Sequence, residues 1–258
     1  MNLGMTLILT ALMATAPQPS PSASPGADPC SGPGGHTAVL AALDRPTVGF
    51  SPCALKPGET LLEAGYQHSS GSAPFAQLGQ GFLRFGVARN LEADAIGPSY
   101  VQQLAPPRAS GFADPGAGLK WEFAHGASSA GALDVLLTVP AGSRAFTSGA
   151  PTQTVNVDYS ASFGKFGFAS TLGVVHAAGY DAVLPSVVAS NQYNARTQLY
   201  LEAFGQSRTG VQTGGLFGFD GGAQYLLTPQ LEVDAEFGHT ASQSAGAPYV
   251  GFGFGVRL

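Results

Sequence analysis

The sequence predicts an all-β protein: a closed, antiparallel, up-and-down transmembrane β-barrel of about twelve strands, with ten as the alternative, preceded by a flexible N-terminal arm. Three observations lead to this prediction. From residue 60 to the end, segments of about ten residues alternate apolar with polar or small side chains. Only 10% of the residues are charged, against roughly 25% in an average soluble protein. The last segment is itself an apolar alternating strand that reaches residue 258.

The N-terminus is typical of an export signal. Residues 3–16 form an apolar run of signal-peptide length that is too short to span a bilayer. Pro17 would hinder cleavage directly before it, so the cleavage site is expected after Ala16 or as late as Ala27. Residues 1–27 are therefore predicted to be a signal peptide. No apolar run elsewhere is long enough to predict a membrane-spanning helix.

Residues 28–58 are predicted to form a periplasmic N-terminal arm or linker, because the sequence around its start is rich in Pro, Ser and Gly and cannot bury a core. Cys30 and Cys53 are the only cysteines. In an oxidising periplasm they could form one disulfide. The enclosed loop of about twenty residues would stabilise the folded state by about 3 kcal/mol in the chain-entropy model. Two unrelated thiols are the alternative.

Residues 59–258 are predicted to form the barrel. The expected strands are 60–68, 80–90, 91–101, 115–125, 131–140, 153–163, 165–176, 195–206, 216–227, 230–240 and 249–258. The stretches 73–80 and 179–190 are ambiguous, and 102–114 and 178–194 are the longest expected loops. Bacterial single-chain barrels have an even number of strands, so these segments predict twelve.

The apolar face of each segment is predicted to contact lipid. A segment of about ten residues can cross a bilayer at the tilt of a barrel strand, whereas ordinary strands have about five or six residues. A sheet in lipid must close, because an open edge would leave backbone groups unpaired. In the last segment the predicted lipid face consists of Val250, Phe252, Phe254, Val256 and Leu258. The alternative is a secreted β-sandwich, in which the apolar faces would point inward.

Charged residues on the polar faces are the candidate lumen-lining residues, since a charge on the lipid face costs about 2–4 kcal/mol near the bilayer midplane. The candidates are Glu63, Arg84, Glu92, Lys120, Glu122, Asp158, Arg196, Glu202, Glu232, Asp234, Glu236 and Arg257. These side chains could line a passage or could form a salt-bridged network that fills the lumen. The acidic trio on one strand either favours cations nearby or pairs with basic members of the set.

No catalytic, metal-binding or nucleic-acid-binding pattern is present in the sequence. There is no G-x-S-x-G elbow, and there is no H-x-x-x-H or C-x-x-C spacing for a metal. His125 and His239 lie at expected strand ends, where a barrel hydrolase would need a serine and an acid beside them. The net charge of −5 argues against nucleic acid. We therefore predict no enzyme, no cofactor and no metal. Asp114 and Asp220 are expected to cap tight turns.

Several sequence blocks resemble one known family. They are DRPT at 44–47, SP at 51–52, KPGETLLEAGY at 56–66, LRFGV at 83–87, GFADPGAGLK at 111–120, VPAGS at 139–143 and FDGGAQYLLTPQLEVD at 219–234. In this order they are similar to the phenol-degradation meta-pathway outer-membrane transporter family, and they cover about residues 44–258. The chain departs from such barrels at Leu258, where an aromatic terminus is usual.

The resemblance implies a channel or facilitator in the cell outer membrane of a diderm bacterium. Its expected cargo is small molecules, aromatic or apolar ones among them. The expected partners are outer-membrane lipid, a small-molecule solute and the barrel-assembly machinery, which would recognise the C-terminal strand. The alternative function is a structural or adhesive outer-membrane barrel with a filled lumen and no transport.

Overall fold

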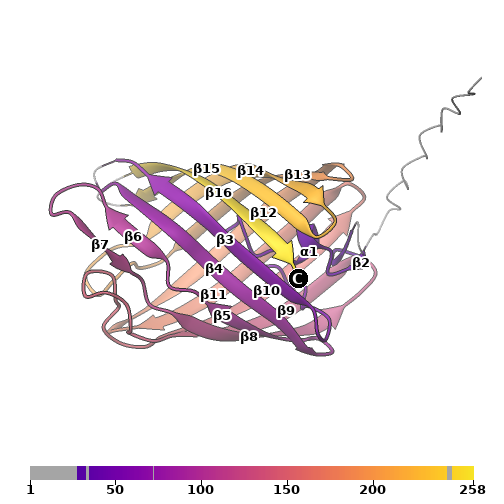
Figure 1. Cartoon of the computed structure of the whole chain (residues 1–258), viewed down its shortest axis with the longest axis horizontal. Helices are drawn as coiled ribbons and strands as arrows, with labels where there is room; N and C mark the ends of the chain where they lie inside the picture. The colour runs from indigo at the N-terminus through magenta and orange to yellow at the C-terminus, as the bar shows by residue number, and fades with distance from the viewer. Residues whose placement is uncertain (1–27, 33–34, 72, 243–245) are drawn as a thin grey trace, which may run out of the picture.

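The computed structural model describes residues 28–32, 35–71, 73–242 and 246–258. The predicted signal peptide, residues 1–27, lies outside this part of the chain. The described residues form one barrel of twelve strands (Figure 1). In chain order these strands are β3 (Thr60–Ser69), β4 (Phe75–Ala88), β5 (Leu91–Ile96), β8 (Gly116–His125), β9 (Ser129–Thr138), β10 (Thr152–Phe163), β11 (Phe166–Ala177), β12 (Tyr180–Asn194), β13 (Thr197–Gln206), β14 (Leu216–Thr228), β15 (Leu231–Ser242) and β16 (Gly246–Arg257).

Every pair of neighbouring barrel strands is antiparallel, and the sheet closes on itself. The C-terminal strand β16 pairs with β3, which also pairs with β4. The prediction of a closed antiparallel barrel is therefore confirmed, and so is the choice of twelve strands over ten. A second, short hairpin of β6 (Tyr100–Gln103) and β7 (Ala109–Phe112) extends the sheet beside β4. Before the barrel lie β1 (Ser31–Gly32), β2 (Gly35–His36) and the one-turn helix α1 (Val39–Ala42).

The strand boundaries differ from the prediction where glycine or proline interrupts the alternation. The ambiguous stretch 73–80 and the predicted strand 80–90 belong to one strand, β4, which is interrupted by a bulge: Gly79 and Gln80 both have positive φ, and the register against β3 shifts there. Such a bulge changes which face the following side chains point to. The predicted strand 91–101 ends at Ile96, shortly before Pro98, which has no N–H to pair. Most of the predicted loop 178–194 is strand β12, so that prediction was wrong.

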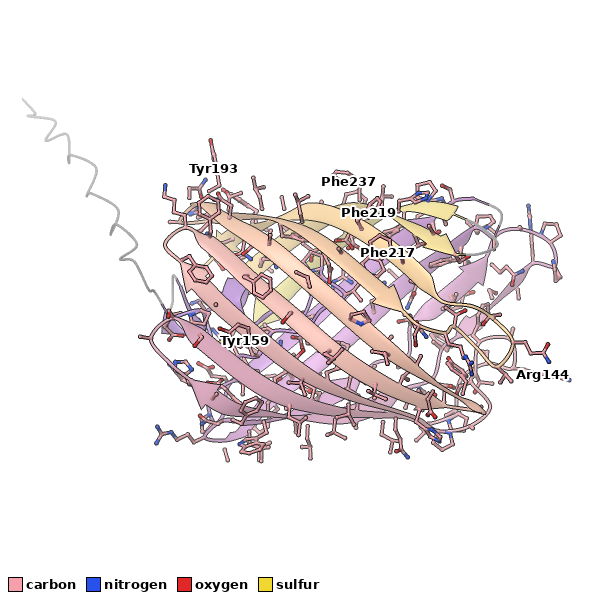
Figure 2. The ribbon with its side chains drawn as sticks, turned by 180° about the vertical axis from the view of Figure 1, so that it is seen from behind. Arg144, Tyr159, Tyr193, Phe217, Phe219 and Phe237 are labelled. Atoms are coloured by element: carbon pink, nitrogen blue, oxygen red, sulfur yellow. A yellow bond between two sulfur atoms is a disulfide. The ribbon has the colours of Figure 1, made fainter. Side chains whose placement is uncertain are left out.

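The outer surface of the barrel is apolar and rich in aromatic rings, as the alternation predicted. Tyr159, Phe217, Phe219 and Phe237 are exposed and point away from the barrel (Figure 2). The polar faces of the same strands are turned inward and buried, among them those of Asp158 and Glu236. This inverted arrangement, with apolar side chains outside and charges inside, is that of a barrel in lipid. Among the described residues, no helix is long and apolar enough to cross a membrane.

The two ends of the barrel differ in the length of their connections. At one end the turns are short, such as Gly164–Lys165 between β10 and β11 and Ala195–Arg196 between β12 and β13. The barrel also begins and ends here, at β3 and β16, and α1 and the C-terminus lie at this end (Figure 1). We call it the short-turn rim. At the opposite end, the long-loop rim, the connections 97–115, 139–151 and 207–215 are longer.

Asp114 ties two of these long connections together. Its carboxylate accepts hydrogen bonds from the backbone N–H of Gly142 at 2.9 Å and of Ser148 at 2.8 Å, and from the Ser148 hydroxyl at 2.6 Å. Partial burial opposes ionisation, but the bonds from Ser148 and Gly142 outweigh it and lower the pKa of Asp114 to about 2. Asp220 was predicted to cap a turn, but it lies within strand β14 and its side chain is buried in the lumen.

An arginine on the lipid-facing surface should destabilise the barrel most in the middle of a strand. Leu201, in the middle of β13, is 68% exposed, and Phe217, at the start of β14, is 50% exposed. Leu201→Arg should lower the free energy of unfolding in phospholipid vesicles by about 2–4 kcal/mol, while Phe217→Arg should lower it by at most about 1 kcal/mol. Denaturant titration measures both. Equal, small effects would show that this surface does not face hydrocarbon.

The Asp114 contacts predict an acid-sensitive loop. The folded-state pKa of about 2 lies below the ordinary value of 3.8, so the stabilisation is complete above that ordinary value and is lost as pH falls towards the folded pKa. Amide hydrogen exchange at Gly142 and Ser148, corrected for intrinsic rates, should therefore be slow near pH 5 and faster near pH 2. Asp114→Asn should give fast exchange at both pH values. Unchanged protection in that variant would contradict the assignment.

Candidate functional site

The lumen is occupied by the segment that precedes the barrel. We call residues 37–55 the plug. The residues Val39, Leu40, Ala42 and Leu43 from α1 and its end pack with Leu55, Leu61 and Leu226 in a buried apolar cluster. Cys30 and Cys53 form a disulfide, with their Sγ atoms 2.02 Å apart, and so join the segment before the plug to the C-terminal end of the plug. Of the predicted arm, residues 37–55 therefore lie against the inner wall of the barrel, whereas Ser31, Gly32 and Lys56–Gly58 are exposed.

The tip of the plug is held by a wall carboxylate. Glu202 on β13 accepts hydrogen bonds from the backbone N–H groups of Val48 and Gly49, both at 2.8 Å. Beside it, the Thr171 hydroxyl on β11 accepts a bond from the N–H of Phe50 at 2.9 Å. A chain without regular structure has N–H groups that must find partners when buried, and charged acceptors make the stronger bonds. Glu202 also accepts a short bond from the Ser186 hydroxyl.

Three more glutamates bind the plug on either side of its tip in the same way. Glu63 on β3 accepts bonds from the N–H groups of Asp44 at 3.0 Å and Arg45 at 2.9 Å. Glu122 on β8 accepts one from Ala54 at 2.9 Å, and Glu92 on β5 accepts one from Leu55 at 2.8 Å. The side chains of these three glutamates are essentially inaccessible to solvent. The wall carboxylates thus replace the water that would otherwise satisfy the plug backbone.

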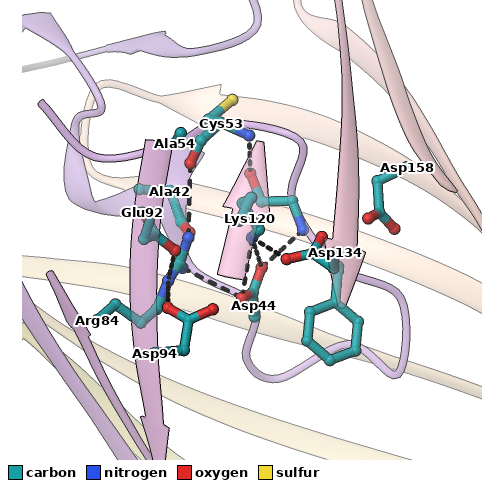
Figure 3. A network of polar contacts seen from close by, with 12 residues as sticks. Ala42, Asp44, Cys53, Ala54, Arg84, Glu92, Asp94, Lys120, Asp134 and Asp158 are labelled. Atoms are coloured by element: carbon teal, nitrogen blue, oxygen red, sulfur yellow. Dashed lines mark hydrogen bonds and ion pairs between the residues drawn. The ribbon is translucent and has the colours of Figure 1, made fainter. Parts of the chain in front are cut away.

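Two buried basic side chains, Arg84 and Lys120, connect carboxylates of the wall to Asp44 of the plug (Figure 3). Arg84 lies 2.7 Å from Glu92, 3.0 Å from Glu63 and 3.3 Å from Asp44. It also donates to the backbone carbonyls of Ala42 and Cys53 in the plug. The Lys120 ammonium lies 3.1 Å from Asp44 and 3.9 Å from Asp134. This network fixes the plug to β4, β5, β8 and β9.

The described part of the lumen holds far more carboxyl groups than basic groups. Twelve buried carboxyl side chains face only two fully buried bases, Arg84 and Lys120. Arg45, whose side chain is 10% exposed, is a third base. The carboxyl groups are Asp44, Glu63, Glu92, Asp94, Glu122, Asp134, Asp158, Glu202, Asp220, Glu232, Asp234 and Glu236. Burial of unpaired charges is costly, so this excess is the main electrostatic feature of the site.

The plug leaves one side of the lumen open. A cavity of about 1080 Å³ lies between the plug and strands β10 to β14. Its wall is mostly uncharged and offers hydroxyl and amide groups, including Thr171, Ser186, Gln198 and Gln224, with the rings of Phe50 and Tyr200 beside them. The lining extends to the turn residues Gly164, Lys165 and Ala195, so the cavity reaches the short-turn rim.

The structure brings most of the predicted lumen residues together. Ten of them are buried on the inner wall: Glu63, Arg84, Glu92, Lys120, Glu122, Asp158, Glu202, Glu232, Asp234 and Glu236. Arg257 lies at the short-turn rim, where it contacts Glu59 at 3.7 Å and the carbonyl of Thr37 at 3.3 Å. Arg196 is an exception, because it occupies an exposed turn between β12 and β13 rather than the lumen wall. The turn interrupts the alternation from which its position was inferred.

Five charged lumen residues were missed among those that the structure describes. Asp94 and Asp134 lie between apolar neighbours on their strands, so the same alternation could have identified them. Asp220 was assigned to a turn because glycines follow it. Asp44 and Arg45 precede the barrel, and no strand pattern could place them in its lumen.

His125 joins the start of the described chain to the barrel wall. Its Nδ1 lies 2.6 Å from Glu122 Oε1 and its Nε2 lies 3.3 Å from Asp28 Oδ2. Asp28, Cys30 and His125 lie close enough together to resemble a metal site. The Cys30 sulfur is part of the disulfide and therefore offers no thiolate.

A closed twelve-stranded barrel with an apolar exterior and a charged interior defines an outer-membrane β-barrel protein. Residues 43–258 match the family described as "Putative MetA-pathway of phenol degradation", and the chain belongs to that family. The resemblance found in the sequence is thereby confirmed. No curated protein matches the sequence.

Three solved structures have similar folds. An outer membrane channel from Pseudomonas putida F1 has a TM-score of 0.60 at 15% identity, over 80% of this chain and 97% of that one. The transport unit of the autotransporter AIDA-I from Escherichia coli has a TM-score of 0.52 at 10% identity, over 77% and 89%. KdgM porin, in complex with disordered oligogalacturonate, has a TM-score of 0.51 at 9% identity, over 74% and 97%. At these identities the likeness is one of fold.

The Glu202 contacts predict how firmly the plug tip is held. Glu202→Gln keeps the shape of the side chain but removes the charge that strengthens two hydrogen bonds. Amide exchange at Val48 and Gly49 should accelerate by about tenfold or more. Mass-spectrometric hydrogen exchange of plug peptides measures this, with Asp181→Asn on the exposed β11–β12 hairpin as the control. Equal exchange in all three proteins would rule out the anchor.

Proposed function

We propose that this protein is an outer-membrane channel for small solutes and that the plug forms its closed state. The observation that carries the proposal is the cavity of about 1080 Å³ that the plug leaves along β10 to β14. A barrel whose lumen served only as a structural core would be expected to fill that space at the density of a protein interior. Membership of the family and the channel-like fold support the same function.

The orientation follows from the loop lengths. Bacterial barrels have short periplasmic turns and longer extracellular loops. The short-turn rim, and with it the entrance of residues 28–58 into the lumen, would then face the periplasm. A solute would enter between the connections 97–115, 139–151 and 207–215 and would leave beside the plug. The C-terminal strand β16, at the same rim, is the segment that we propose the barrel-assembly machinery recognises.

The lining of the cavity supports passage of small polar or aromatic molecules. Hydroxyl and amide groups of Ser186, Gln198 and Gln224 can exchange hydrogen bonds with a solute, and the ring faces of Phe50 and Tyr200 can stack on an aromatic one. This agrees with the aromatic cargo that the family description implies. The proposed role is transport, and it requires no catalytic group or cofactor.

Opening would require the plug tip to move. The tip, residues 47–50, lines the cavity with Thr47, Gly49 and Phe50, and Glu202 and Thr171 hold it. The disulfide and the Arg84 network hold the two ends of the plug more firmly, because a covalent bond and a buried charge network must be broken together. The tip is thus the part that can shift while the ends stay in place.

Planar-bilayer conductance tests the proposal. The native protein should show small currents with brief openings, and a Glu202→Gln/Thr171→Val variant should show openings that last several-fold longer, because the tip has lost its anchors. Asp181→Asn should behave as the native protein does. Liposomes that contain the variant should take up a small phenol faster than empty liposomes. A barrel that passes neither ions nor phenol in either form would favour a structural barrel with a filled lumen.

A further inference from the structure

The plug residue Arg45 lies in a slot that two glycines make in the inner wall. Gly65 on β3 and Gly253 on β16 are direct cross-strand partners. A Cβ atom at Gly65 would lie 2.3 Å from Arg45 Cζ, and one at Gly253 would lie 2.6 Å from Arg45 Nε. Real atoms do not approach so closely, so any side chain at either position would displace the guanidinium. The absence of a side chain at both positions therefore makes room for the guanidinium.

The slot offers more hydrogen-bond acceptors than Arg45 uses. Arg45 Nη1 donates to Gln80 Oε1 at 2.6 Å, and Nη2 lies 3.4 Å from Asp234 Oδ1. Asp234 Oδ2 and Arg45 Nε are both buried without a hydrogen-bond partner among the described residues. The contact at 3.4 Å is longer than a well-formed pair between a guanidinium and a carboxylate. A guanidinium free of the plug backbone could turn to bind both Asp234 oxygens.

The surroundings of the slot are strongly acidic. Strands β13 to β15 bring five buried carboxyl groups to this side of the lumen, and Arg45 is the only base that the described residues place in contact with them. The five are Glu202, Asp220, Glu232, Asp234 and Glu236. Glu202 is bound by the plug and by Ser186, and Asp220 accepts a hydrogen bond from Tyr249 at 2.5 Å. Both oxygens of Glu232 and Oδ2 of Asp234 have no hydrogen-bond partner among the described residues, and such buried groups need positive charge or hydrogen bonds nearby.

A separate observation also points to a ligand. Tyr200 is only 4% exposed, and its hydroxyl has no hydrogen-bond partner in the part of the chain that the structure describes. The hydroxyl lies over Gly222, where a Cβ would be 3.0 Å from it, and the cross-strand partner of Gly222 is Glu236. It is therefore directed at the acidic wall. A buried hydroxyl without a partner is rare and requires an explanation.

We propose that this acidic slot is a binding site for small organic cations with a guanidinium group, and that the Arg45 side chain occupies it in the closed state. The Arg45 backbone stays on Glu63 when the tip shifts, and only its side chain leaves the slot. The site rests on the proposed channel function and specifies one class of its solutes. Arg45 and Tyr200 also line the cavity, so the cavity borders the residue that fills the slot. The planar fork of a guanidinium matches a carboxylate better than an ammonium does.

Removal of Arg45 tests the site by chemical rescue. The full-length Arg45→Ala protein, folded in detergent, should bind guanidinium chloride at low millimolar, non-denaturing concentration in isothermal titration calorimetry. The native protein should show no binding in that range, because Arg45 fills the slot. Arg257→Ala is the matched control: it also removes an arginine near a carboxylate, at the short-turn rim, and should create no site.

The acceptor is tested by a second substitution. Arg45→Ala/Asp234→Asn should bind guanidinium at least tenfold more weakly than Arg45→Ala does. Potassium and magnesium chlorides serve as probes of charge without a planar fork, and neither should compete. Arg45→Gln replaces Arg45→Ala if heat-modifiable gel mobility shows that the alanine variant does not fold.

The proposal is overturned if neither Arg45 variant binds guanidinium, if Asp234→Asn has no effect, or if potassium competes equally. Binding is measured without transport, so the two proposals can fail separately. Calorimetric binding together with barrels that never conduct would contradict the channel and keep the site. Conducting barrels without guanidinium binding would keep the channel and remove the site.

Discussion

The structure of the lumen depends on hydrogen bonds between the backbone of the plug and the buried carboxylates of the barrel wall. The plug has no strand partner for its backbone N–H groups, and the carboxylates of the wall strands are buried away from solvent. Each supplies what the other lacks: glutamates at 63, 92, 122 and 202 accept bonds from the plug amides. Arg84 then binds the wall carboxylates and the plug carbonyls together. Removal of either partner would leave buried charge or buried N–H groups unpaired, which is costly in both cases.

The exterior follows a different constraint. In hydrocarbon every backbone group must be paired within the protein, so the sheet has to close, and the pairing of β16 with β3 achieves this. Once the sheet is closed, strand alternation sends apolar side chains to lipid and polar ones to the lumen. The acidic lumen is thus a consequence of the membrane fold, and the plug is one way to accommodate it. The excess of carboxyl groups over bases near β13 to β15 shows that the accommodation is partial.

The sequence predicted the barrel well because its signal is local and repeated. Two-residue alternation placed ten of the twelve candidate side chains on the inner wall, and failed at Arg196, where a turn replaces the strand. Strand boundaries were lost where Gly79 and Gln80 form a bulge, since a bulge reverses the alternation. The position of the plug could not be predicted. Asp44 and Arg45 are placed by contacts with strands distant in sequence, and such contacts leave no periodic signal in residues 28–58.

The central claim is that movement of the plug tip away from the wall opens the channel. It can be tested by locking the tip in place. Gly49 and Ser186 are close enough for a disulfide, because a Cβ at Gly49 would lie 3.3 Å from Ser186 Cβ. Conductance of the oxidised Gly49→Cys/Ser186→Cys protein is compared with that of each single variant. The account predicts openings in both single variants and none in the cross-linked double variant. Equal currents in the cross-linked protein would contradict it.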